Sequence, residues 1–160
     1  MATFYKTTGS GGGGHWVDTA WENTKDIPYQ WGGKWKDPNK RPSGIDCSGL
    51  ICHILRKYAG ANFGETNAQG IYNRLKGNYN NVIKVNGQRK TFDQSKLKKG
   101  DIIYFGSKNG NGTNHVGIIH SIRGGKAYML NASGTHRKVV VSPIDEYIDN
   151  HKFAAITRLR

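Results

Sequence analysis

The 160-residue sequence is poor in cysteine, in acidic side chains and in long hydrophobic runs. Its two cysteines, Cys47 and Cys52, lie five positions apart in a segment predicted to be helical. At that spacing they point to different faces and are too far apart for a disulfide. Both are therefore expected to be reduced, which excludes a disulfide scaffold and a zinc site of the paired CxxC kind. No apolar run approaches the roughly 18 residues that a membrane-spanning helix needs.

The scarcity of acidic residues leaves a strongly basic chain. Lysine and arginine together number 24, aspartate and glutamate only 11, and the formal net charge is +13. A charge of this size favours an anionic partner, namely nucleic acid, an anionic membrane or an anionic cell-wall polymer. The charge alone does not choose among the three.

The N-terminal stretch "MATFYKTTGSGGGG" lacks the apolar central region of a secretory signal. The sequence therefore predicts synthesis in the cytoplasm without a signal peptide. Action outside the cell would then require another export route or release by lysis. Residues 1–14 have the composition of a flexible glycine-rich tail, and residues 15–160 are expected to form a single domain.

Hydrophobic spacing predicts three helices in the first half of the chain. The first lies within 15–26, the second begins at Asp46 or Cys47, and the third lies within 65–77. The segment between the first two is rich in proline and glycine and is expected to be an irregular loop. An Asn-Gly pair within 80–92 indicates a hairpin or an irregular pair of strands.

The second half of the chain is typical of β-structure. Five strands separated by glycine-rich or polar turns are expected, at 100–106, 115–122, 126–133, 138–144 and 153–159. Helices followed by an antiparallel meander predict an α+β fold, with the N-terminal helices packed on an antiparallel sheet of about five strands.

Cys47 lies in "GIDCSGLICHIL", at the predicted start of the second helix. Unpaired N–H groups and the positive end of the dipole favour a thiolate at a helix N-terminus. Gly44 and Gly49 would allow another backbone to approach closely. These features indicate a nucleophile, whereas Cys52, inside the helix, is expected to be a small buried residue.

A cysteine nucleophile needs a base, usually a histidine that a third polar group orients. His115 follows a polar loop and starts an apolar strand, so its side chain can face the end of a helix. His120 should point to the other face of that strand, and the remaining histidines lie in polar contexts or on the far side of a helix. Asn131, on the next strand, can accept the imidazole N–H and fix the tautomer, or can simply be a polar residue near a turn.

Five motifs together resemble the NlpC/P60 family of peptidases in order and spacing: "PYQWGG" (28–33), "GIDCSGLI" (44–51), "LKKGDIIYF" (97–105), "NHVGIIHSI" (114–122) and "YMLNASG" (128–134). The resemblance covers about 16–159 and implies a papain-like fold. It also implies a cysteine peptidase or amidase that acts on peptidoglycan stem peptides, usually at the γ-D-glutamyl–diamino acid bond. Cys47 matches the nucleophile and His115 the base, while Asn131 falls where the family most often carries a histidine.

The resemblance also implies residues that bind substrate. Tyr29 matches a tyrosine that lines the groove, and Trp31 belongs to the same motif. Asp46 and Ser48 flank the nucleophile where the family often binds the free amine of a stem peptide. Structural alternatives stay open, since Asp46 can cap the helix, Ser48 can bond to backbone and Tyr29 can belong to the core.

The chain departs from the average family member in a long basic insert, "GKWKDPNKRPSG" (33–44). The net charge can replace a separate wall-binding module by attracting anionic wall polymers. We expect a monomer without metal or cofactor, acting on peptidoglycan as a phage lysin or as a secreted antibacterial toxin with a cognate immunity protein. The alternatives are an acyltransferase acting on lipids and amines with the same Cys-His pair, or a non-enzymatic module that binds wall or nucleic acid.

Overall fold

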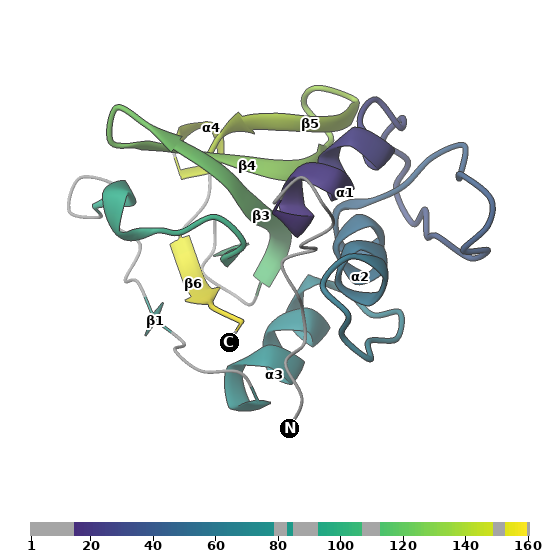
Figure 1. Ribbon diagram of the computed structural model, residues 1–160, viewed down its shortest axis with the longest axis horizontal. Helices are drawn as coiled ribbons and strands as arrows, with labels where there is room; N and C mark the ends of the chain where they lie inside the picture. The colour runs from purple at the N-terminus through teal and green to yellow at the C-terminus, as the bar shows by residue number, and fades with distance from the viewer. Residues whose placement is uncertain (1–14, 79–82, 85–92, 107–112, 149–152, 160) are drawn as a thin grey trace.

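The computed structural model describes residues 15–78, 83–84, 93–106, 113–148 and 153–159 (Figure 1). The tail expected at 1–14 lies outside these residues, as does most of the strand pair expected within 80–92. None of the helices in the described part of the chain is long and apolar enough to cross a membrane.

The three predicted helices are present as α1 (Trp16–Thr24), α2 (Cys47–Lys57) and α3 (Ala68–Asn78). Two further elements, the 3₁₀ turn η2 (Gln94–Lys96) and the single-turn helix α4 (Asp145–Ile148), were not predicted from the sequence. Neither is long enough to show the periodicity by which a helix is recognised.

The strands form one antiparallel sheet in the order β1-β6-β2-β3-β4-β5. Their bounds are β1 (Ile83–Lys84), β2 (Ile102–Gly106), β3 (Thr113–Arg123), β4 (Lys126–Ser133), β5 (Lys138–Pro143) and β6 (Phe153–Thr157). The five longer strands are the five that the sequence predicts, so the expected α+β class is confirmed. The turn between β3 and β4 uses Gly124 and Gly125 at φ values of 57° and 78°, a conformation that strongly favours glycine.

Alternate side chains of the sheet face two separate apolar clusters. On β2, Ile102 and Tyr104 belong to the larger cluster with the helices, whereas Ile103 and Phe105 belong to a smaller cluster on the other face. All three long helices contact β3, and Figure 1 shows α1 and α2 beside β3 and β4. The helices therefore cover one face of the sheet, as predicted.

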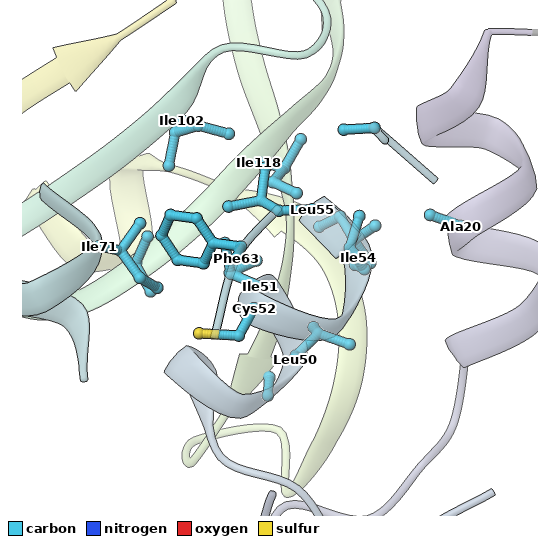
Figure 2. Close-up of a cluster of buried hydrophobic side chains, with 14 of the residues drawn as sticks. Ala20, Leu50, Ile51, Cys52, Ile54, Leu55, Phe63, Ile71, Ile102 and Ile118 are labelled. Carbon is cyan, nitrogen blue, oxygen red and sulfur yellow. The ribbon is translucent and has the colours of Figure 1, made fainter. Parts of the chain in front are cut away.

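Helix α2 is central to the larger cluster. Its Leu50, Ile51, Ile54 and Leu55 are fully buried and point toward the sheet and the neighbouring helices (Figure 2). Burial of one such side chain contributes about 1.5–3 kcal/mol. The apolar stripe thus holds the first turn of α2 in a fixed place against the sheet.

The loop before α2 is irregular, as predicted, but it is anchored at defined points. Single β-bridges join Pro28 to Lys138 and Tyr29 to Ile45. The rings of Trp35 and His53 stack with centroids 3.6 Å apart and an angle of 3° between their planes. His53 on α2 is thus buried rather than solvent-facing, because the indole of the basic insert covers it.

Candidate active site

The first turn of α2 presents Cys47 on a rigid support. Asp46 is the N-cap, and its Oδ1 accepts the N–H of Gly49 at 2.7 Å. A Cβ on Gly49 would come within 2.5 Å of the carbonyl oxygen of Gly33, so glycine is needed where the loop crosses the helix. The close approach expected of Gly49 is confirmed, and the capping alternative for Asp46 describes part of what that residue does.

The Cys47 thiol lies against the start of β3. Its Sγ–H donates to the carbonyl oxygen of Asn114 at 4.0 Å, and the backbone N–H groups of Val116 and Ser48 point to the sulfur. The residues directly before and after His115 therefore both touch the nucleophile candidate. The fold brings together two segments that are 67 positions apart.

Burial raises the pKa of the Cys47 thiol to about 11, and the Asp46 carboxylate adds to this rise. The N–H groups of Val116 and Ser48 and the Lys34 ammonium act in the opposite direction and are outweighed. The lowering expected from N–H groups at the helix start is present in the Ser48 N–H, but it does not set the pKa of the unliganded protein. Desolvation of the sulfur is the larger effect, and the thiol needs a base to release its proton.

His115 is buried, and its Nε2 lies 3.1 Å from Oδ1 of Asn131. The Nδ2 group of Asn131 donates to the carbonyl oxygen of Met129 and to Oγ of Ser142, each at 3.1 Å. Because only the NH₂ end can donate to a carbonyl, the oxygen end must face the histidine. His115 Nε2 therefore carries the proton, and in the neutral ring Nδ1 carries the lone pair.

Tyr147 also packs against His115 and was not predicted. Its ring stacks on that of His115 with centroids 3.9 Å apart and an angle of 3° between the planes. Burial raises the Tyr147 pKa to about 12, although a hydrogen bond with Ser133 opposes the rise. Tyr147 belongs to α4, whose four residues give no sequence signal.

A cavity of about 410 Å³ opens at Cys47. All four residues predicted to bind substrate line this cavity, namely Tyr29, Trp31, Asp46 and Ser48. Lys34, Asn114 and residues at the start of α3 also line it. The Trp31 side chain is 87% exposed, the one large hydrophobic side chain in the described residues left open to solvent. The structure thus gathers the predicted residues around one opening.

Lys34 was also missed from the sequence. Its Nζ lies 2.9 Å from each carboxylate oxygen of Asp46 and 2.9 Å from Oγ of Ser48. The side chain comes from the basic insert, 12 positions before Asp46. It carries no sequence signal because one lysine among several in a basic loop does not stand out.

Among the residues that the structure describes, no three His, Cys, Asp or Glu side chains are grouped so that they could hold a metal ion. Both cysteines are free. The reactive and polar groups that the structure places at this site include the Cys47 thiol, the His115 imidazole and the polar side chains around the cavity.

Comparison with known proteins identifies the class. The family model for the NlpC/P60 family matches residues 26–158. The peptidoglycan endopeptidase RipB of Mycobacterium tuberculosis (strain CDC 1551 / Oshkosh) is 31% identical over 125 residues, which cover 74% of this chain and 42% of RipB. The chain therefore belongs to the NlpC/P60 family, and it spans less than half the length of that relative.

Solved structures agree on the fold. An NlpC/P60 family protein from Bacillus cereus superposes with a TM-score of 0.59 at 24% identity, covering 90% of this chain and 39% of the other. The P60 domain of an antigen from Mycobacterium avium paratuberculosis gives a TM-score of 0.58 at 18% identity and covers 90% of both chains. The papain-like α+β fold that the sequence predicts is confirmed.

Proposed function

We propose that this chain is a cysteine peptidase that hydrolyses an amide bond in the stem peptide of peptidoglycan. One observation carries the proposal: the Cys47 thiol touches the backbone on both sides of His115, whose ring is held by Asn131. RipB is named a peptidoglycan endopeptidase, which supports the same substrate class. The γ-D-glutamyl–diamino acid bond is the proposed site of cleavage.

The reaction begins with proton transfer from Cys47 Sγ to His115 Nδ1. Because burial holds the thiol pKa near 11, this transfer accompanies attack by the sulfur on the scissile carbonyl carbon. Asn131 Oδ1 accepts the Nε2–H and stabilises the imidazolium that forms. The series Cys47–His115–Asn131 therefore ends on a neutral amide, and the positive charge stays on the imidazolium.

The tetrahedral oxyanion forms beside the first turn of α2. The backbone N–H of Cys47 belongs to the helix start, where N–H groups have no partner within the helix, and it can stabilise the oxyanion. The proton on His115 passes to the leaving amine as the C–N bond breaks. Water, deprotonated by His115, then attacks the thioester and releases the carboxylate product and the Cys47 thiol.

The cavity supports a peptide substrate over a lipid. Charged and hydrogen-bonding side chains line it beside the rings of Tyr29 and Trp31, namely Lys34, Asp46, Ser48, Asn67, Gln69 and Asn114. An acyltransferase would need a long apolar groove for its acyl chain, and the Lys34–Asp46 ion pair in this lining disfavours one. Tyr29 and Trp31 are proposed to pack against the substrate at the rim.

The net charge of +13 suits a site of action on the anionic cell wall. We place the activity there, after export or lysis, as a phage lysin or as an antibacterial toxin. A toxin would imply an immunity protein in the producing cell, and a lysin would not. Inhibition of the wall-hydrolysing activity by a co-encoded protein would separate these two roles.

The test is mass spectrometry of purified Gram-negative and Gram-positive sacculi after digestion. Wild-type protein should release fragments cut within the stem peptide, and Cys47→Ala should release none. Cys52→Ala is the matched control, since it removes the other thiol of the same helix and should keep the activity. Full hydrolysis by Cys47→Ala would refute the proposal, as would activity that EDTA abolishes and zinc restores.

A further inference from the structure

The residues on either side of the nucleophile form a site suited to a cation, and the chain itself already fills it. The Asp46 carboxylate and the Ser48 hydroxyl converge on one point, where the Lys34 ammonium lies 2.9 Å from three of their oxygens. The Lys34 and Asp46 side chains are 26% and 14% exposed, so the pair is largely shielded from water. An ammonium has three N–H donors, and these three acceptors can take all of them.

The pairing removes the attraction that Asp46 would otherwise exert on a positively charged substrate. Asp46 Oδ1 also accepts the Gly49 N–H at 2.7 Å, so both carboxylate oxygens have partners within the chain. A substrate ammonium would have to displace Lys34 or come to rest beside a like charge. Either event weakens the binding of a substrate ammonium. An uncharged group at the same place does not suffer this loss.

The surroundings of Lys34 reinforce this effect. Lys34 lines both the Cys47 cavity and a neighbouring cavity of about 500 Å³ formed by the basic insert. That second cavity is also lined by Lys36, Lys40 and Arg41, with Asp37 as its one acidic residue. The approach to the nucleophile from this side is therefore positive, and it disfavours a second cation.

We propose that Lys34 is a specificity-determining residue that makes the site select peptides with a blocked, uncharged amino end over peptides with a free N-terminal ammonium near the scissile bond. The inference rests on the proposed function and differs from the expectation that Asp46 and Ser48 bind a free amine. The preferred substrate is an N-acylated stem peptide, as in a stem still joined through an amide to the glycan.

The test compares two synthetic stem peptides that differ only at the N-terminus, one with a free amine and one N-acetylated. Wild-type enzyme should show the higher kcat/KM on the acetylated peptide. Lys34→Met keeps the aliphatic stem and removes the charge, so it should shift the ratio of the two kcat/KM values toward the free amine by about tenfold or more. The ratio is the readout because Lys34 also lowers the pKa of Cys47, and its loss affects both substrates alike.

Lys36→Met is the matched control, because Lys36 lines the neighbouring cavity and not the Cys47 cavity. It should move the ratio much less than Lys34→Met does, because Lys36 adds charge to the approach but does not line the cavity that holds Cys47. A wild-type preference for the free amine, or a ratio that Lys34→Met does not move, would overturn the inference. Should Lys34→Met fail to fold, Lys34→Gln removes the charge while keeping a donor for Asp46, and it answers the same question.

A second measurement separates failure of the inference from failure of the proposed function. Iodoacetamide labelling of Cys47 is followed with and without each peptide. The free-amine peptide should slow labelling in Lys34→Met and not in wild type, even if neither peptide is cleaved. Absence of cleavage would thus count against the proposed function. If the free-amine peptide slowed Cys47 labelling equally in wild type and in Lys34→Met, the result would count against the role of Lys34.

Discussion

The first turn of α2 and its middle carry the two cysteines of the chain under similar electrostatic conditions. Burial raises the pKa of both Cys47 and Cys52 to about 11. Cys47 opens into a cavity and touches the backbone on both sides of His115, whereas Cys52 is fully buried and its Sγ–H donates to the carbonyl oxygen of Thr66 at 3.8 Å. A raised pKa therefore does not distinguish the two thiols; the neighbouring His115, the proposed base, and the opening into a cavity distinguish Cys47, the proposed nucleophile.

The middle of α2 is specialised for packing. Cys52 joins the larger apolar cluster, and the adjacent His53 stacks beneath Trp35 with its Nε2 lacking a hydrogen-bond partner. The first turn of the same helix is instead surrounded by polar side chains with defined hydrogen bonds. The middle of α2 thus packs in the apolar core, whereas its N-terminal end is polar and carries the Cys47 thiol.

The largest expected effect comes from exchanging each cysteine for alanine. Cys47→Ala should reduce kcat on stem peptides by about 10³-fold or more, because the nucleophile is lost. Cys52→Ala should leave kcat nearly unchanged and lower the free energy of unfolding by about 1 kcal/mol, through the small cavity it creates. Steady-state kinetics and urea unfolding measure the two effects, and comparable losses of kcat in both variants would contradict the comparison.

The second effect concerns His115, the proposed base beside Cys47. Asn131→Ala should lower kcat by about 10²-fold or more, because the His115 tautomer is no longer held. Ser142→Ala removes one of the two acceptors of the Asn131 NH₂ group and should cost only about threefold, since the Met129 carbonyl still fixes the amide. Equal losses in the two variants, measured as kcat at constant pH, would show that Asn131 acts only through packing.

A third prediction tests the buried middle of the helix by pH. Burial, with Arg56 and Lys57 nearby, lowers the pKa of His53 to about 4. In the unfolded chain His53 binds a proton near pH 6.5, whereas in the folded protein it does so only near pH 4. The free energy of unfolding therefore falls as the pH drops through this window. The loss should be about 2–3 kcal/mol between pH 7 and pH 4.

His53→Phe keeps a ring against Trp35 and removes the titrating group. Urea unfolding of both proteins at pH 7 and at pH 4.5 isolates the contribution of His53 as the difference between them. The same acid-induced loss in His53→Phe as in wild type would assign the effect to other groups, such as His15 and His120, whose pKa values burial also lowers.

The last prediction concerns the reactivity of the two thiols in the unliganded protein. Iodoacetamide labelling of Cys47 should rise about tenfold per pH unit between pH 8 and pH 10, because the thiolate fraction grows toward a pKa near 11. Cys52 should stay unlabelled while the protein is folded, since it is fully buried. Peptide mapping by mass spectrometry measures both, and a Cys47 rate that is already constant at pH 7 would indicate a thiolate formed before substrate binds.

The sequence predicts well where hydrophobic spacing and turn chemistry act locally. The start of α2 at Cys47 and the bounds of β4 follow from an aspartate cap and from paired glycines. The proximity of Cys47, His115 and Asn131 could be predicted because Cys47 starts a helix and the other two lie on neighbouring strands. These are features that a single segment carries by itself.

The sequence does not show contacts that depend on how an irregular loop folds back. Lys34 reaches Asp46 across 12 positions, and Trp35 covers His53 from the same loop. The raised pKa of Cys47 was missed for a related reason, because desolvation depends on what the assembled fold packs around the sulfur. Tyr147 was missed because four residues of helix give no periodic signal.

The division of the site between helices and sheet has a consequence for incomplete chains. The thiol belongs to the helical portion, ending within α3, and the imidazole and its amide partner belong to β3 and β4. Neither portion alone contains Cys47 together with His115, the proposed nucleophile and base. Fragments of either portion should therefore be inert, and any activity recovered on mixing them would report their association directly.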